Sequence, residues 1–394
     1  MIMRLQDCYN FEDFRKLARR RLPGPIFNYI DGAADDEVTH QRNTTSYQDY
    51  ELIPNVLRGG GKLDTTVDVL GRELAVPFYC SPTALQRLFH HEGERAVASA
   101  SANAGTLFGV STLGTVSVTE MRKKYSSPQT FQFYFHKDRE LNKAMLTQAK
   151  AAGVDSIMLT VDSITGGNRE RDLRTGFSIP FRLNMRGIFE FAVKPTWGLQ
   201  FMMHEKFSLP QLDDHVDFKS DSLSLGRYFT EMLDPTMTWD DVAELVEFWD
   251  GEFCLKGVMS TKDALRARDI GCTGIVISNH GGRQLDGVRA PIDQLGDIRQ
   301  AIGGDFDILI DGGVKRGTHI LKALARGATA VGIGRYYLFG LSIGGERGVQ
   351  RVLDLLTQEV TRGMQLLGVR SISEINEECV DVLAKNVRGN LIQN

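Results

Sequence analysis

A repeating pattern of hydrophobic and polar positions runs from about Leu74 to Arg335. Each repeat begins with a short apolar run, continues through a polar loop and ends in an amphipathic stretch. The runs are Val76–Cys80, Leu107–Ser111, Thr130–Phe135, Ser156–Val161, Phe253–Gly257, Gly274–Ser278, Ile308–Ile310 and Ala330–Ile333. Such continuous apolarity is typical of parallel strands covered on both faces. Eight strand–helix units in series predict an α/β fold, a closed (β/α)₈ TIM barrel, rather than an open doubly wound sheet.

Start and stop signals delimit the helices of this barrel. Three hydroxyl residues precede an acidic residue by three positions, a spacing that satisfies free amides at a helix start: Ser117, Thr238 and Ser260. Three glycines occur where a left-handed residue would end a helix: Gly153, Gly271 and Gly327. The residues from Thr238 to Trp249 also carry one apolar stripe, which predicts a helix packed on the sheet.

Other segments surround the predicted barrel of residues 74–345, and together they form a single domain of residues 1–394. Residues 1–73 are expected to form helices at Asn10–Arg21 and Ile26–Gly32, followed by a hairpin around Gly71. Residues 163–237 form an insertion after the fourth strand, far longer than the usual loop of roughly four to six residues. Residues 346–394 are expected to form C-terminal helices.

The insertion contains a stretch, residues 184–207, that mixes large apolar residues with basic ones. These residues are Phe189, Phe191, Trp197, Phe201 and Met202, with Arg186, Lys194 and Lys206. One interpretation is a partly ordered lid or a contact between subunits. The alternative is a surface that contacts a membrane, because amphipathic stretches of aromatic and basic residues can lie in the bilayer interface.

Composition and charge narrow the class of protein. The formal net charge of −4 gives no sign of a polyanion-binding surface, so we expect no nucleic-acid partner. The five cysteines lack CxxC spacing, so we expect neither a disulfide framework nor a metal site. No signal peptide and no apolar run of roughly 18 residues is visible. A cytoplasmic location is expected, peripheral at the inner face of the membrane if residues 184–207 contact it.

The strongest chemical signal follows the sixth predicted strand. His280 and Arg283 are separated by two glycines, which allow both side chains to turn towards one pocket. Imidazole is a suitable base near neutral pH, and guanidinium offers paired donors to a carboxylate. The alternative is a histidine that only completes a loop network.

Other strand ends add polar groups at the same mouth of the barrel. Asp162, after the fourth strand, is suited to hydrogen-bond an imidazole, or else caps its own loop. Shortly afterwards Arg169 and Arg171 offer further cations, and the sequence pattern does not choose between them. Tyr134 would present a hydroxyl inward or be satisfied by backbone groups. Lys256, within an apolar strand, is costly to bury unless it faces an anion or an electron-rich ring.

The seventh and eighth strands end in features of a phosphate site. Glycine-rich segments let backbone amides approach an anion, and cations stand beside them: Asp311, Gly312, Gly313, Lys315, Gly334 and Arg335. In TIM barrels the loops after these two strands are the common phosphate-binding corner.

Taken together, the chain resembles the FMN-dependent 2-hydroxy acid dehydrogenase and oxidase family, which includes L-lactate dehydrogenase, glycolate oxidase and mandelate dehydrogenase. The resemblance covers essentially the whole chain. The motifs that carry it are Ser278-Asn279-His280-Gly281-Gly282-Arg283-Gln284-Leu285-Asp286, Leu255-Lys256-Gly257-Val258, Gln132 with Tyr134, Leu159-Thr160-Val161-Asp162 and Asp311-Gly312-Gly313.

The resemblance implies roles for particular residues. His280 would be the base and Asp162 its partner, with Arg283 and Arg169 holding the substrate carboxylate. Tyr134 and Tyr29 would contact the substrate. Contacts to FMN are implied for Pro82, Thr83, Ala84, Ser111, Gln132, Thr160, Lys256, Ser278, Asp311, Gly312, Gly313, Lys315, Gly334 and Arg335.

The same resemblance implies an L-2-hydroxy acid substrate, lactate-like or mandelate-like, and FMN as cofactor. Quinone, a cytochrome or oxygen would accept the electrons, and a homotetramer is expected. Two positions depart from common members: Lys315 replaces a frequent arginine, and Leu113 stands where glycolate oxidases often carry tryptophan. The alternatives are an FMN-dependent barrel isomerase and a non-catalytic flavin-binding protein.

Overall fold

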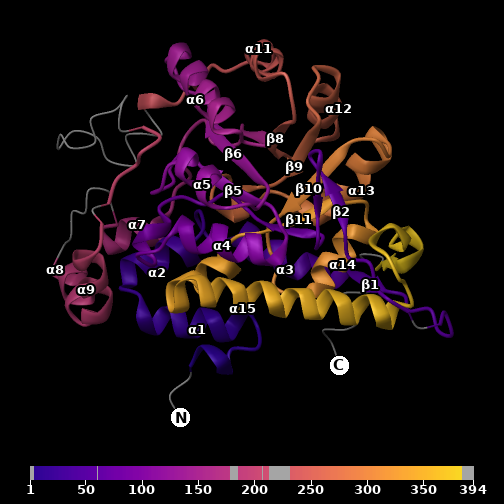
Figure 1. Cartoon of the computed structure of the whole chain (residues 1–394), viewed down its shortest axis with the longest axis horizontal. Helices are drawn as coiled ribbons and strands as arrows, with labels where there is room; N and C mark the ends of the chain where they lie inside the picture. The colour runs from indigo at the N-terminus through magenta and orange to yellow at the C-terminus, as the bar shows by residue number, and fades with distance from the viewer. Residues whose placement is uncertain (1–3, 60, 178–184, 206, 213–230, 384–394) are drawn as a thin grey trace.

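Eight parallel strands close into a barrel at the centre of the computed structural model, which describes residues 4–59, 61–177, 185–205, 207–212 and 231–383 (Figure 1). The strands are β4 (Phe78–Cys80), β5 (Phe108–Ser111), β6 (Gln129–Tyr134), β7 (Ser156–Thr160), β8 (Phe253–Val258), β9 (Gly274–Ile277), β10 (Asp307–Asp311) and β11 (Ala330–Ile333). They pair in chain order, and β11 closes the ring against β4. The TIM-barrel prediction is confirmed.

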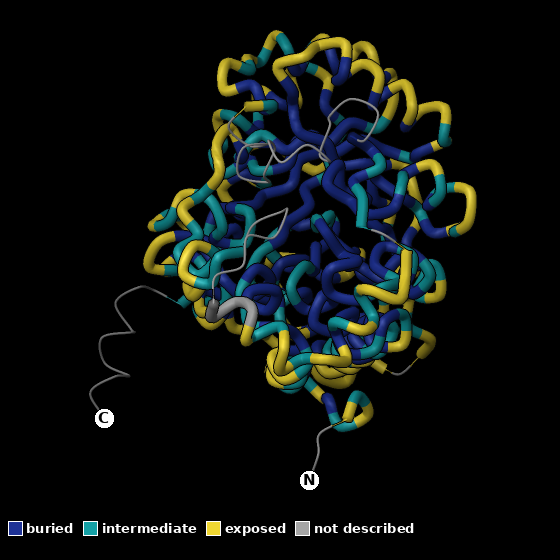
Figure 2. The backbone as a smooth tube through the Cα atoms, turned by 90° about the vertical axis from the view of Figure 1, so that its left-hand side faces the viewer, coloured by how far each residue is buried: buried dark blue, intermediate teal, exposed yellow. Residues whose placement is uncertain are grey.

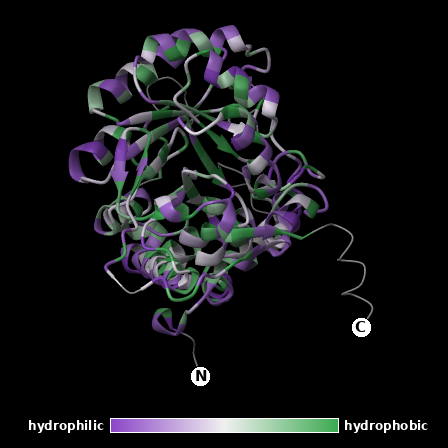
Figure 3. Ribbon diagram, turned by 90° about the vertical axis from the view of Figure 1, so that its right-hand side faces the viewer, coloured by the Kyte–Doolittle hydropathy of each residue, from purple (hydrophilic) through white to green (hydrophobic). Residues whose placement is uncertain are grey.

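The barrel strands are buried on both faces, as their apolar composition predicted. Every strand residue is buried except Gly257 and Asp307, which are half-buried. Figure 2 shows buried backbone at the centre of the molecule, and Figure 3 shows hydrophobic strands there. The predicted strand ends differ from the observed ones by up to two residues, because apolar residues such as Val76 continue beyond the hydrogen-bonded ladder.

Helices surround the barrel, and those with start or stop signals in the sequence lie where these signals predicted. They are α4 (Glu94–Ala104), α5 (Val118–Lys124), α6 (Arg139–Ala152), α11 (Trp239–Trp249), α12 (Thr261–Asp269), α13 (Pro291–Ile302), α14 (Gly317–Ala325) and α15 (Arg335–Leu367). The side chains of Ser117, Thr238 and Ser260 accept hydrogen bonds from the amide three residues later. Gly153 ends α6 in the left-handed conformation, with φ of 74°.

The N-terminal segment covers both ends of the barrel. It contains η1 (Leu5–Asp7), α1 (Phe11–Arg21), α2 (Gly24–Asp31), α3 (Val38–Thr45), η2 (Ser46–Asp49), β1 (Tyr50–Leu52), β2 (Val67–Val69) and β3 (Arg72–Leu74). The predicted hairpin around Gly71 is confirmed, since β2 and β3 pair antiparallel. Its apolar residues Val69, Leu70 and Leu74 form one buried cluster with barrel residues such as Tyr79 and Leu309.

The C-terminal segment differs from the predicted series of helices. Helix α15 runs along α1 beneath the barrel and is kinked at Gly345, where a Cβ would lie 1.8 Å from Glu92 Oε2 (Figure 1). After Leu367 the described chain forms two short turns, η6 (Ile372–Glu374) and η7 (Glu377–Cys379), and strand β12 (Val380–Val382). Because β12 pairs with the distant β1, no local sequence pattern signals this strand.

The insertion after β7, the fourth barrel strand, contains α7 (Glu170–Thr175), α8 (Met185–Ala192) and α9 (Pro195–Met203). Figure 1 shows α8 and α9 at one side of the molecule, beside α2. Trp197 is buried against the core, whereas Phe189, Met202 and Met203 are 66%, 74% and 77% exposed. None of the described helices combines the length and apolarity that crossing a bilayer requires. The side chain of Arg186 and all of Lys206 lie outside the described residues.

Candidate active site

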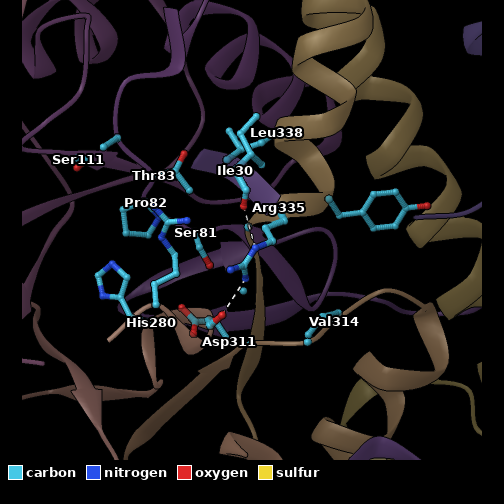
Figure 4. Close-up of a pocket in the computed structure, with 18 of the residues that line it drawn as sticks. Ile30, Ser81, Pro82, Thr83, Ser111, His280, Asp311, Val314, Arg335 and Leu338 are labelled. Atoms are coloured by element: carbon cyan, nitrogen blue, oxygen red, sulfur yellow. Dashed lines mark hydrogen bonds between the residues drawn. The ribbon is translucent and has the colours of Figure 1, made fainter. Parts of the chain in front are cut away.

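A pocket opens at the carboxyl ends of the barrel strands. All the predicted site residues line it except Asp162 and Ser278, which lie behind lining residues. In Figure 4, His280 lies at one side and Val314 at the other, with Arg335 between them.

A left-handed turn after β9 presents His280. The φ angles of His280, Gly281 and Gly282 are 57°, 66° and 77°, in a region that L-residues rarely adopt. A Cβ on Gly281 would lie 2.7 Å from Arg335 Nη1. The side chain of Asn279 accepts the Gly282 amide at 3.1 Å and stabilises the turn. The two glycines of the motif are therefore required by the backbone as well as by close packing.

Asp162 orients the His280 imidazole from behind. Its Oδ1 atom lies 3.0 Å from His280 Nδ1 and accepts the Ser163 hydroxyl at 2.9 Å. Burial raises the pKa of this carboxyl, but the nearby His280 and Lys256 outweigh burial and lower it. The carboxylate is therefore ionised at neutral pH. Because it holds the Nδ1 atom of His280, the other ring nitrogen, Nε2, stays available to a ligand in the pocket.

The last turn of α2 holds two guanidinium groups that line the pocket. Arg283 donates to the carbonyls of Tyr29 at 2.5 Å and Gly32 at 3.1 Å, and its guanidinium lies 4.8 Å from the Tyr29 ring centroid. Arg335 donates to the carbonyls of Ile30 at 2.9 Å and Gly32 at 2.8 Å. These carbonyls are the negative pole of the helix, which favours cations.

Positive charge concentrates in this part of the pocket. Burial and the neighbouring Arg169 lower the pKa of Arg283 to about 10, and burial and Arg283 lower that of Arg335 to about 9. Both remain protonated near pH 7 with only neutral hydrogen-bond acceptors, an arrangement that favours anionic ligands.

The structure separates the two arginines that the sequence pattern left equivalent. Arg169 lines the pocket, and its buried Nε atom has no hydrogen-bond partner among the described residues. Arg171 instead forms ion pairs with Asp31, at 2.8 Å, and with Glu37. Only Arg169 is therefore available to a ligand.

Lys256 belongs to a buried triangle of polar groups at the base of the pocket. Its Nζ donates to Ser278 Oγ at 2.8 Å and pairs with Asp311 Oδ2 at 2.9 Å, while Ser278 Oγ donates to Asp311 Oδ1 at 2.6 Å. Burial lowers the pKa of Lys256, but Asp311 and Asp162 outweigh burial and raise it. The ammonium is charged and still lines the pocket.

A second row of hydrogen bonds crosses three neighbouring strands. Ser111 Oγ donates to Gln132 Oε1 at 2.9 Å, and Gln132 Nε2 donates to Thr160 Oγ1 at 2.9 Å. Tyr134 lies further along the same strand, and burial and Asp162 raise the pKa of its phenol. Its hydroxyl is therefore a neutral hydrogen-bond donor at neutral pH.

The loops after β10 and β11 form the predicted anion corner. Gly312 and Gly313 adopt φ of 102° and 76°, and a Cβ on Gly313 would lie 2.0 Å from the Asn43 carbonyl oxygen. Lys315 Nζ lies 3.4 Å from Glu12 and 4.5 Å from the Phe11 ring centroid. Helices α1 and α3 therefore help to build this corner.

Several pocket residues were missed by the sequence analysis. They are Phe11, Ile30, His40, Thr44, Ser81, Val314, Gly332, Tyr336 and Leu338. Behind them, the Tyr337 hydroxyl donates to the Ser81 carbonyl at 2.7 Å and lies 2.7 Å from Thr83 Oγ1. The residues Phe11, Ile30, His40, Thr44, Tyr336 and Leu338 reach the pocket through packing of α1, α2, α3 and α15, so no local motif marks them, whereas Ser81, Val314 and Gly332 lie at strand ends beside predicted site residues.

Comparison with known proteins identifies relatives along almost the entire chain. The profile of the FMN-dependent dehydrogenase family matches residues 18–382. The chain is 40% identical to an L-lactate oxidase of Nostoc sp., over 93% of this chain and 96% of that protein. It is 37% identical to a putative L-lactate dehydrogenase of Mycobacterium tuberculosis, over 97% and 91% of the two chains. Among solved structures, the monotopic membrane protein (S)-mandelate dehydrogenase superposes with a TM-score of 0.90 at 32% identity, covering 96% of this chain and all of that one.

Proposed function

Because the chain belongs to the FMN-dependent dehydrogenase family, whose members oxidise 2-hydroxy acids, we propose that it oxidises an L-2-hydroxy acid with His280 as the base. The observation that carries this proposal is the convergence of three groups on one pocket. His280, held by Asp162 at 3.0 Å, lines the same pocket as the half-buried Arg283 and Arg169. A base beside paired cations suits a substrate that has both a hydroxyl and a carboxylate.

The residues of the pocket fit FMN. The glycines at 312 and 313 and the cations Lys315 and Arg335 suit its phosphate, and Ser81 offers a buried hydroxyl with no partner among the described residues. Lys256 and the row from Ser111 to Thr160 suit the polar edge of the ring. Bound FMN supplies a two-electron acceptor.

The protein's own groups would bind the substrate and hold its proton. Arg283 and Arg169 bind the carboxylate, and Tyr134 and Tyr29 orient the 2-hydroxyl group. His280 Nε2 takes the proton that leaves the substrate, and the Asp162 carboxylate stabilises the resulting imidazolium. The charged Lys256 favours negative charge on the reduced cofactor.

The substrate class in this proposal is lactate-like or mandelate-like. Leu113 contributes a fully buried aliphatic side chain to the pocket, which favours an apolar substituent on the substrate. Two relatives carry the names L-lactate oxidase and (S)-mandelate dehydrogenase, which support the same range. Quinone, a cytochrome or oxygen would receive the electrons, and the homotetramer stays a prediction.

Anaerobic mixing of the yellow holoenzyme with single substrates tests the proposed reaction. We expect L-lactate or (S)-mandelate, but not the opposite enantiomers, to bleach the flavin and form the 2-oxo acid. His280→Gln should retain FMN and its colour but lose bleaching, because only the base is removed. A holoenzyme that no member of a panel of 2-hydroxy acids reduces would favour an FMN-dependent isomerase or a flavin-binding protein instead.

The proposal also includes membrane contact through α8 and α9. Phe189, Met202 and Met203 leave much apolar surface exposed, and Lys194 lies between the two helices. A relative described as a monotopic membrane protein supports this assignment. The enzyme would then act at the inner face of the membrane, near a quinone.

Vesicle sedimentation tests this contact. Replacing Met202 and Met203 by serine should release the enzyme from vesicles that contain phosphatidylglycerol, because it removes apolar surface from the interface. Leu366→Ser is the matched control, since Leu366 is also about 70% exposed but lies at the far end of α15. Equal binding of both variants would exclude α9 as the contact.

A further inference from the structure

The inner side of the insertion contacts two loops that line the pocket. The Trp197 indole nitrogen donates to the Leu88 carbonyl at 2.8 Å, in the loop after β4. Arg87, in the same loop, donates to the Glu205 carbonyl. Gln211 donates to the carbonyls of Ser111 and Val116, which begin and end the loop after β5. The insertion therefore contacts, through Trp197, Glu205 and Gln211, two loops that contribute residues to the pocket.

Gln211 makes the most specific of these contacts. Its side chain is almost fully buried, and Nε2 lies 3.0 Å from Ser111 O and 3.2 Å from Val116 O. Both partners are acceptors, so the amide nitrogen must face them and use both of its hydrogens. Gly114 leaves the room for this approach, because a Cβ there would lie 3.1 Å from Nε2.

The loop that Gln211 binds carries two pocket residues. Ser111 Oγ donates to Gln132, and Leu113 lines the pocket. Leu113 also accepts the Leu85 amide at 3.0 Å, which links this loop to the one after β4. Buried Glu94, the first residue of α4, also accepts the backbone amide of Thr115 at 2.8 Å. The loop is thus held by a barrel helix and by the insertion.

We propose that Gln211 is a positioning residue for the cofactor-facing loop of residues 111–116, so that the insertion sets the geometry around the flavin. This inference rests on the proposed contact of Ser111 and Gln132 with FMN. Losing the two hydrogen bonds would leave the Ser111 carbonyl with the Gly114 amide, at 2.8 Å, and remove the Gln211 donor from Val116, so that Leu113 could move in the pocket. A purely structural role would lower stability without changing the environment of bound FMN.

Two substitutions of Gln211 separate these roles. Gln211→Met keeps the shape but removes the donor, so it should weaken FMN binding to apoprotein by roughly tenfold and shift the visible absorption bands of bound FMN. Gln211→Glu places a carboxyl group opposite the two carbonyls, and burial raises the pKa of this carboxyl group. The two carbonyl oxygens repel the ionised carboxylate, whereas the protonated carboxyl group donates one hydrogen bond to them. FMN binding to this variant should therefore recover as the pH falls.

Gln200→Leu is the matched control, because Gln200 lies in the same insertion and, within the described part of the chain, its side-chain amide makes only one long hydrogen bond, accepted from Arg21 at 3.5 Å. Trp197→Phe is a milder companion that should shift the bands in the same direction if Gln211→Met does not fold. Wild-type bands and affinity in all Gln211 variants at every pH, even with a lower Tm, would overturn the proposal. Since these measurements use oxidised FMN, they remain valid if no hydroxy acid proves to be a substrate.

Discussion

Replacing Asp162 by asparagine should slow substrate oxidation without removing the base. The carboxylate Oδ1 and His280 Nδ1 are 3.0 Å apart, and both side chains are largely buried. Charge centres about 4 Å apart interact by about 4 kcal/mol at an effective dielectric constant of about 20. Asparagine can retain a neutral hydrogen bond of about 1 kcal/mol. The imidazolium then loses about 3 kcal/mol of stabilisation, which corresponds to a rate of flavin reduction roughly 100-fold lower.

Single-turnover bleaching of FMN under anaerobic conditions measures this step directly. The Asp162→Asn variant should bind FMN normally, because Asp162 lies behind His280 and does not line the pocket. Ser163→Ala is the control, since it removes a hydroxyl that donates to the same oxygen but keeps the charge of Asp162. The rate of flavin reduction in this variant should fall by roughly tenfold or less. A reduction rate of Asp162→Asn within threefold of the wild type would refute the role assigned to the carboxylate.

Three further predictions concern the site and its support. Lys256→Met should destabilise the apoprotein by about 3–5 kcal/mol in urea unfolding, because it leaves the Asp311 carboxylate buried without its cation. Gly282→Ala should cost more than about 1 kcal/mol and reduce FMN content, since φ is 77° there and a new Cβ would lie 2.7 Å from the His40 amide nitrogen. Acid unfolding should depend on Asp31. Burial raises the pKa of this carboxyl, but its two guanidinium partners outweigh burial and lower the pKa below the ordinary value. The stabilisation by Asp31 is therefore present above about pH 4 and is lost as the pH falls further. Asp31→Asn should flatten that acid limb in a thermal-melt series, and an unchanged limb would contradict the assignment.

Two arginines of the pocket, Arg283 and Arg335, are held by neutral carbonyls, whereas the lysines Lys256 and Lys315 pair with carboxylates. Arg283 and Arg335 bind carbonyls at the end of α2, whereas the acidic Asp31 and Glu37 are occupied by Arg15 and Arg171 outside the pocket. This division leaves the charge of the pocket arginines uncompensated until an anionic ligand arrives. Binding of a phosphate or carboxylate ligand should therefore stabilise the native state strongly.

The sequence by itself determined the barrel and the centre of its chemistry. Short apolar runs, capping hydroxyls and terminal glycines act over a few residues, so their spacing predicted strands and helices to within about two residues. The backbone of the segment from Ser278 to Arg283 requires glycine at 281 and 282, because both residues adopt the left-handed conformation. The local spacing of His280 and Arg283 therefore suffices to assign both side chains to one pocket.

Only the tertiary structure decided which distant groups meet. Arg169 and Arg171 have equivalent local patterns, and the acidic partners supplied by the N-terminal segment separate them. Tyr29 lines the pocket and Gln211 binds the Ser111 carbonyl, each from a segment far along the chain from the strand loop that it contacts. The pairing of β1 with β12 arises in the same way. Such contacts depend on how helices and loops pack around the barrel, and short-range patterns in the sequence do not predict this packing.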